Sequence, residues 1–189
     1  MQKIFIKNRK EQKIAVIIEE ENPQKGLAFV MHGLGGFKEQ SHVAVQGKAF
    51  LEKGYTVVRF DATHSYGESD GKFEDVTTTR SYEDLTDVIA WAKGQSWYRE
   101  PFCLSGHSFG GMCVTLYAEE HPTEVEALSF TSLVISRKLW WEAFPEKLRN
   151  EWQQTGWRVW PSITKPGLMK RLPYTFITDG FSYDLLSGV

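Results

Sequence analysis

The sequence predicts an α/β protein built on a mostly parallel sheet with helices on both faces. Short apolar runs typical of buried strands alternate along the chain with amphipathic, helix-like segments, and this alternation is the pattern of parallel sheets. One apolar run passes directly into a helix through the glycine-flanked serine turn GHSFG at 106–110. The chain has 189 residues, which is enough for one domain with a substantial core.

The elements are expected in the following order. Two strands parted by a polar turn open the chain and should form an antiparallel hairpin. The later segments alternate between buried strands and helices that end at glycine, proline or polar turns. Ser81 and Asp84 resemble a capping box before a helix whose apolar residues share one face. The expected strands are 3–7, 13–19, 27–31, 55–60, 101–106 and 127–131, all but the opening pair buried, and the expected helices are 40–53, 81–92 and 109–120.

The composition changes after Ser132, where tryptophan becomes frequent. A helix is expected over 137–155, then an irregular segment, then a short strand at 174–177. We interpret residues 134–180 as a lid inserted over the edge of the sheet, between a core at 1–133 and the start of a return to the core at 181–189. The aromatic side chains of the lid either grip a substrate or hold the lid to the body, and the second role is favoured for any single tryptophan.

The turn at 106–110 has the pattern G-x-S-x-G of a nucleophile elbow. Glycines on both sides let strand and helix approach closely, so that Ser108 sits on a sharp, strained turn with its hydroxyl at the top of the sheet. The N–H of Phe109 then points to where an oxyanion would form. The alternative is an ordinary turn serine in another α/β domain. A dinucleotide-binding turn fits poorly, because its glycine order differs.

A second glycine-rich turn, HGLGG at 32–36, follows the strand at 27–31. In this position the N–H of Leu34 would be the other oxyanion donor, and a plain strand-to-helix turn is the alternative. His32 is expected to be structural rather than a catalytic base. Asp61 and His64 could form a catalytic pair, but the favoured interpretation has Asp61 holding a tight loop and His64 in solvent.

Composition excludes several classes of function. The net charge is −2, with acidic and basic residues interspersed, so neither a nucleic-acid surface nor a polybasic membrane contact is expected. Cys103 and Cys113 are expected to be buried free thiols. We expect no cofactor and no metal site, because no spaced cluster of metal ligands occurs. The N-terminus lacks the apolar core of a signal peptide and no run could span a membrane, so a cytoplasmic location is expected.

With these motifs in view, the chain resembles the α/β-hydrolase superfamily, and within it small bacterial esterases of the cinnamoyl or feruloyl type. The resemblance implies a serine esterase with a small-molecule ester substrate. It also implies a lid and a Ser-acid-His order along the chain. The loop ATHSYG at 62–67 departs from the shorter FNGHG-like turn of close relatives. The matching stretches are HG and GG at 32–33 and 35–36, VVRFD at 57–61, YGESDGKFEDVT at 66–77 and GHSFGG at 106–111.

The acid and the histidine that the resemblance implies are missing after Ser108. The only later histidine is His121, which would lie on the order of 20 Å away along the helix. Asp179 and Asp184 follow Ser108, but no histidine follows them. We therefore expect the chain to be truncated and to lack the last two strands of the fold.

Two functions remain open. In the first, the chain represents a serine hydrolase lineage that acts on carboxylic esters through Ser108, with Leu34 and Phe109 as oxyanion donors. In the second, it is a non-catalytic or pseudo-hydrolase remnant that binds or self-associates. The open apolar edge of the sheet is expected to favour a homo-oligomer or poor solubility. An unorthodox base at His32 or His64 is a third, less favoured alternative.

Overall fold

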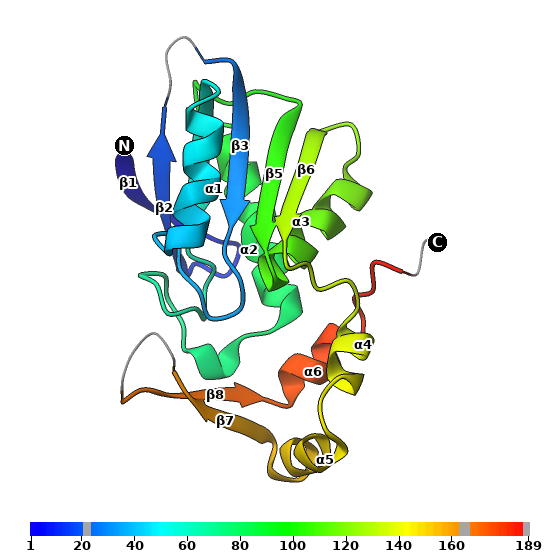
Figure 1. The fold of residues 1–189 in the computed structure, drawn as a ribbon. Helices are drawn as coiled ribbons and strands as arrows, with labels where there is room; N and C mark the ends of the chain where they lie inside the picture. The colour runs from blue at the N-terminus through cyan, green and yellow to red at the C-terminus, as the bar shows by residue number, and fades with distance from the viewer. Residues whose placement is uncertain (21–23, 163–166, 187–189) are drawn as a thin grey trace.

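A computed structural model describes residues 1–20, 24–162 and 167–186, and its main feature is a six-stranded sheet in the order β1-β2-β4-β3-β5-β6. The last four strands in this order run parallel, β2 runs antiparallel to β4, and β1 and β2 form the expected antiparallel hairpin (Figure 1). The predicted fold class is confirmed. The strands are β1 Gln2–Lys7, β2 Lys13–Glu19, β3 Gly26–Met31, β4 Tyr55–Phe60, β5 Phe102–His107 and β6 Val125–Thr131.

Helices cover both faces of this sheet. Helix α1 (Ser41–Leu51) lies on one face, and α2 (Thr78–Ala92) and α3 (Phe109–Glu120) lie on the other (Figure 1). Side chains of β3 alternate between the two sides, as the period of two in a strand requires. Ala28 and Val30 pack in the cluster of α1, whereas Phe29 and Met31 join the larger core with α2 and α3. Cys103 and Cys113 are buried and free, as expected.

Helix α2 begins earlier than the sequence pattern predicts. Its N-cap is Thr77, whose side chain accepts a hydrogen bond from the Arg80 N–H. Ser81 lies inside the helix and donates to the Thr77 carbonyl. Asp84 is buried and accepts hydrogen bonds from Thr63 and Asn8. The predicted capping box is therefore wrong, because these side chains are used within the helix and in tertiary contacts.

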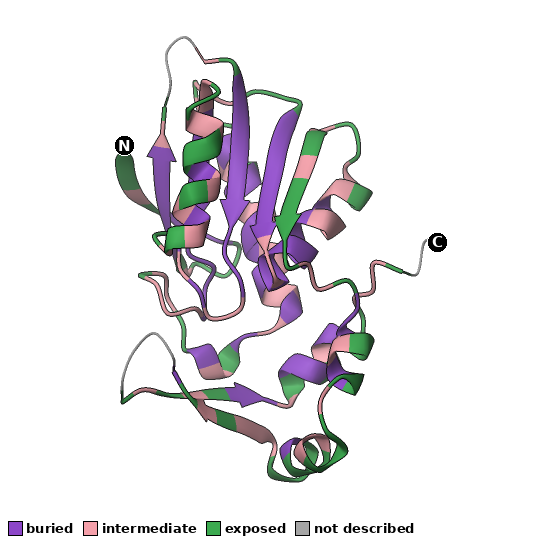
Figure 2. Ribbon diagram, in the orientation of Figure 1, coloured by how far each residue is buried: buried purple, intermediate pink, exposed green. Residues whose placement is uncertain are grey.

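Strand β6 differs from the expected buried strand. Among the described residues it pairs only with β5, so one side of it is an open edge. Most of its residues are exposed (Figure 2), and the Phe130 side chain is 46% accessible to solvent. The burial predicted from the apolar composition of this strand is therefore wrong, whereas the predicted open edge of the sheet is present among the described residues.

The segment after β6 lies beyond the carboxyl ends of the strands (Figure 1). The expected single helix is split at Pro145, and residues 174–177, expected as a strand, belong largely to α6. The hairpin of β7 and β8 was not expected. The elements are a short 3₁₀ helix η1 Phe73–Asp75 before α2 and, in the segment predicted to be a lid, α4 Arg137–Glu142, α5 Glu146–Thr155, β7 Trp157–Pro161, β8 Met169–Pro173 and α6 Thr175–Gly180.

The lid shares the core of the body. Trp141, Trp152 and Phe176 belong to the same buried cluster as residues of α2 and α3, and this favours a packing role for them. The chain then returns past α4, where the Leu185 N–H donates to the Ile135 carbonyl. The end of the expected return, residues 187–189, lies outside the described residues. In the described part of the chain, no helix combines the length and apolar character that a membrane span requires.

Candidate active site

Ser108 lies between β5 and α3 in an unusual backbone conformation. It is the N-cap of α3, with φ 53° and ψ −116°. Residues other than glycine rarely adopt positive φ, and such conformations persist only where the surrounding structure imposes them. Here the Ser108 N–H donates to the Thr131 carbonyl at 2.8 Å, which ties the turn to the end of β6. The structure therefore has the strained strand-to-helix turn that the sequence predicts.

Close backbone contacts around Ser108 explain the flanking glycines. A Cβ on Gly106 would lie 2.6 Å from backbone atoms of Gly110 and Gly111. A Cβ on Gly110 would lie 2.3 Å from the His32 carbonyl oxygen. These distances are too short for any side chain. Glycine at these positions thus lets β5, α3 and the turn after β3 meet.

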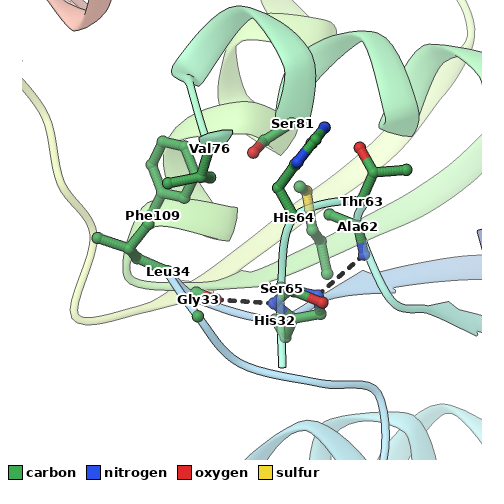
Figure 3. A pocket seen from close by; sticks show the side chains of 12 residues that line it. His32, Gly33, Leu34, Ala62, Thr63, His64, Ser65, Val76, Ser81 and Phe109 are labelled. Atoms are coloured by element: carbon green, nitrogen blue, oxygen red, sulfur yellow. Dashed lines mark hydrogen bonds between the residues drawn. The ribbon is translucent and has the colours of Figure 1, made fainter. Parts of the chain in front are cut away.

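The second glycine-rich turn packs directly against Ser108. A Cβ on Gly33 would lie 3.4 Å from the Ser108 Cβ and 2.9 Å from His107 Nδ1. Leu34 and Phe109 line one small cavity together with Val76 (Figure 3). The structure therefore brings Ser108, Leu34 and Phe109 together at the carboxyl ends of β3 and β5, while their catalytic roles stay predictions.

His32 has a structural position. It is 3% exposed, and its Nε2 accepts a hydrogen bond from the Ala62 N–H at 3.0 Å. Because Nε2 accepts, Nδ1 carries the proton and donates to the Gly33 carbonyl at 2.7 Å (Figure 3). Burial lowers the pKa of His32, which favours this neutral form. No ring nitrogen remains to act as a base, so His32 links the Gly33 turn to the loop after β4.

Asp61 and His64 do not form a catalytic pair. Asp61 holds its loop as expected, since its carboxylate accepts hydrogen bonds from the Glu68 and Lys38 N–H groups. His64 is 5% exposed, so its expected position in solvent is wrong. Its Nδ1 lies 3.1 Å from the Lys72 carbonyl oxygen, and burial lowers its pKa. The loop folds over His64 instead of presenting it to solvent.

Lys38 forms a buried ion pair that the sequence did not indicate. Its side chain is inaccessible, and Nζ donates to Asp61 at 2.8 Å and to Glu68 at 2.7 Å. Burial acts to lower the pKa of Lys38, but the hydrogen bonds to these carboxylates raise it overall. Within the described residues, Glu39, Asp61 and Glu68 form the one acidic group close enough to hold a metal ion. The ammonium group of Lys38 already binds all three carboxylates.

Two further histidines are His107 within the elbow itself and His42 on α1, and the sequence predicts no role for either. The rings of His42 and His107 have centroids 4.2 Å apart. His42 Nε2 and His107 Nδ1 are buried without hydrogen-bond partners. Burial and the neighbouring His42 imidazole lower the pKa of His107. The pairing depends on the contact between α1 and β5, which no local pattern reveals.

No histidine completes a catalytic pair in the described part of the chain. Ser108 Oγ has no hydrogen bond to an imidazole there, although all five histidines of the sequence are described. His121 follows the end of α3 and stacks on Tyr117 at 4.4 Å between ring centroids, as a residue at the far end of the helix would. The arrangement supplies a strained serine and two glycine-rich turns, but no positioned base.

Comparison with known proteins agrees with this geometry. Residues 32–160 match the sequence profile of the X-Pro dipeptidyl-peptidase (S15) family. No curated protein sequence matches the chain.

Among solved structures, the chain is similar to mouse alpha/beta hydrolase domain-containing protein 10, with a TM-score of 0.77 and 21% identity over 98% of this chain and 72% of that one. It is also similar to Est1E from Butyrivibrio proteoclasticus with bound ferulic acid. The TM-score is 0.78 and the identity 19%, and the match covers 96% of this chain and 72% of that one. The α/β hydrolase GrgF from Penicillium sp. sh18 matches with a TM-score of 0.71 and 18% identity, and the match covers 98% of this chain and 74% of that one. The chain has the α/β-hydrolase fold.

The backbone contact at Gly110 yields a first prediction. Gly110→Ala should lower the free energy of unfolding by about 1–3 kcal/mol, because the new methyl group overlaps the His32 carbonyl. Gly94→Ala is the matched control, since a Cβ there would meet only the Trp91 carbonyl at 3.6 Å. Urea denaturation of both variants measures the difference. Equal stabilities would show that the contact imposes no constraint.

The buried ion pair yields a second prediction. Lys38→Met should lower the free energy of unfolding by about 3–5 kcal/mol, because it leaves the buried Asp61 carboxylate without its cation. Lys48→Met, which removes an exposed partner of Glu52, should change it by less than about 1 kcal/mol. Chemical denaturation at neutral pH compares the two. If Lys38→Met lowers the free energy of unfolding as little as Lys48→Met does, the ion pair does not stabilise the protein as proposed.

Proposed function

The chain belongs to the X-Pro dipeptidyl-peptidase (S15) family, a membership that supports a hydrolase in general. We propose that it is a serine hydrolase that acts on carboxylic esters through an acyl-enzyme on Ser108. The observation that carries the proposal is the backbone of Ser108, held at φ 53° where strand meets helix. Strain of this kind is maintained at a cost and is concentrated at functional sites. The contact of Gly33 with Ser108 further supports it.

One solved structure of the same fold favours an ester over a peptide as the substrate. Est1E, which is similar in fold, was solved with ferulic acid, and this supports an acyl group of comparable chemistry.

In the proposed reaction, Ser108 Oγ attacks the ester carbonyl carbon and the carbonyl oxygen becomes an oxyanion. The N–H groups of Leu34 and Phe109 stabilise this charge, and one such donor typically contributes about 10²–10³ in rate. Collapse of the intermediate expels the alcohol and leaves an acyl group on Ser108. Water then releases the acid. The apolar walls formed by Leu34, Val76 and Phe109 would limit access of bulk water.

The serine needs a base, because a neutral hydroxyl is a weak nucleophile. His32 and His64 are engaged elsewhere. Other sources are the His42–His107 pair, of which His107 lies within the elbow, and a histidine outside the given sequence. Labelling of the serine with a reactive phosphonate tests whether either source operates.

We expect a fluorophosphonate probe to label the purified chain and to leave Ser108→Ala unlabelled, because only an activated serine reacts. Ser132→Ala is the matched control, since Ser132 also has positive φ but lies outside the elbow. It should be labelled like the unmodified chain. In a labelled protein, loss of the label in His107→Gln would identify the histidine pair as the base. Absence of label in well-folded protein would overturn the catalytic proposal for this chain.

A second candidate function is a non-catalytic chain that self-associates. Two observations favour it: the absence of an imidazole bonded to Ser108 among the described residues, and the open edge of β6 with its exposed Phe130. Unpaired strand edges offer N–H and C=O groups to another chain. In this alternative, a second copy would pair along β6.

Light scattering tests this alternative. The chain should elute as a dimer or larger species, and Phe130→Lys should shift it toward monomer because a charge on the edge opposes pairing. Val159→Lys, which places the same charge on an exposed residue of β7, should leave the mass unchanged. A monodisperse monomer for the unmodified chain would eliminate self-association.

A further inference from the structure

The β7–β8 hairpin presents an apolar face to solvent. Paired residues of antiparallel strands lie on the same face, and side chains alternate between the two faces along each strand. Val159 and Met169 are each 51% exposed, although both side chains are apolar. The face to which they belong, which we call the outer face, has a single charged side chain, that of Arg171. The residues of the outer face are Trp157, Val159, Pro161, Met169, Arg171 and Pro173.

The opposite face of the hairpin packs on the rest of the chain and carries cations. Trp160 contacts Phe73 of η1, with 6.3 Å between the ring centroids, and Lys170 Nζ lies 5.1 Å from the centroid of the Tyr66 ring. Arg158 lies over aromatic rings as well. A sheet with one face in water normally has its polar side chains on that face. The hairpin has the inverse pattern, because two of its cations face the protein and its apolar side chains face solvent.

The charge of the hairpin is positive. The sequence from 156 to 173 contains no aspartate or glutamate, although acidic residues outnumber basic ones in the whole chain. On the outer face, Arg171 is exposed, and its Cζ lies 4.7 Å from the centroid of the Trp157 ring. Helix η1, which carries acidic residues, contacts the opposite face. The net charge of −2 therefore conceals a local region that would attract an anionic partner.

The side chains of the outer face favour a lipid surface over a nucleic acid. A single-stranded nucleic acid binds through bases stacked on aromatic rings and phosphates paired with cations, and it makes little use of aliphatic side chains. At a bilayer surface, tryptophan and arginine lie at the level of the headgroups, and apolar side chains enter the boundary of the acyl chains. Val159, Pro161 and Met169 beside Trp157 and Arg171 match the second arrangement.

We propose that the outer face of the β7–β8 hairpin docks on a lipid bilayer that carries anionic headgroups. Val159 and Met169 enter the boundary of the acyl chains, and Arg171 pairs with a headgroup phosphate. The contact is peripheral, and it requires no turnover at Ser108. The hairpin lies beyond the carboxyl ends of the sheet strands (Figure 1), so docking would hold that end of the sheet toward the lipid.

Co-sedimentation with vesicles tests the proposal. The purified chain should sediment with vesicles of phosphatidylglycerol and phosphatidylcholine in equal parts, and much less with phosphatidylcholine alone. Val159→Asp should weaken this binding by about tenfold or more, because a buried apolar contact becomes an anion at an anionic surface. Arg171→Gln should weaken it by roughly fivefold, the usual effect of one basic residue near such a surface. Val45→Asp is the matched control, since Val45 is 65% exposed on α1, and it should bind like the unmodified chain.

Several outcomes would overturn the inference. These are the absence of sedimentation with the anionic vesicles, and equal binding of Val159→Asp and Val45→Asp. If Val159→Asp fails to fold by circular dichroism, Met169→Gln decides, because Met169 is equally exposed on the same face. Unchanged vesicle binding in Met169→Gln would then refute the proposed contact. Binding of oligothymidylate without binding of vesicles would assign the face to nucleic acid, and a smaller mass of Val159→Lys in light scattering would assign it to a second copy of the chain.

Discussion

The close approach of three backbone segments at Ser108 is the constraint on which the rest of the structure depends. The turn after β3, the end of β5 and the start of α3 meet where Gly33, Gly106 and Gly110 leave no room for a side chain. Strand β3 can lie beside β5, and α3 against both, only because of these contacts. The positive φ of Ser108 follows from this packing, since a relaxed backbone there would separate the helix from the sheet.

Two buried cations illustrate opposite solutions to the cost of burying charge. Lys38 is surrounded by Asp61, Glu68 and Glu39, and it fastens the turn after β3 to the loop after β4. Arg137 lies over the rings of Phe109, Trp140 and Phe176, and its Nε and Nη2 atoms have no hydrogen-bond partner. The first arrangement is complete and therefore structural. In the second, aromatic ring faces provide the attraction that carboxylates provide in the first.

Local patterns predicted the body of this protein well, because its strands and helices depend on periodicities that neighbouring residues define. β2, β4 and α3 have the predicted bounds, and the glycine turns lie where predicted. The predictions were wrong where contacts between residues far apart in the sequence determine the structure. Asp84 resembled a helix cap but bonds Asn8 and Thr63, far from it in sequence. Strand β6 looked buried because an apolar run does not say how many neighbours it has.

The lid and the charged residues of the site were the least predictable parts. Pro145 divides the expected helix, and the hairpin of β7 and β8 depends on pairing across a connection that local patterns do not specify. Ser108, Leu34 and Phe109 were found because their turns have recognisable spacing. Lys38 and Arg137 were not found, because the surroundings of these buried cations form only in the folded chain.

The distribution of tryptophan gives the protein a built-in optical reporter. Trp91 in α2 and Trp97 in the connection between α2 and β5 pack together against the body. The other tryptophans lie in the lid, where Trp140 stands over Arg137 and Trp160 stands over Arg158. Indole emission is sensitive to nearby cations and to water, so most of the intrinsic fluorescence should follow the lid rather than the sheet. Changes around these side chains can then be followed in the unlabelled protein. The remaining tryptophan residues are Trp141, Trp152 and Trp157.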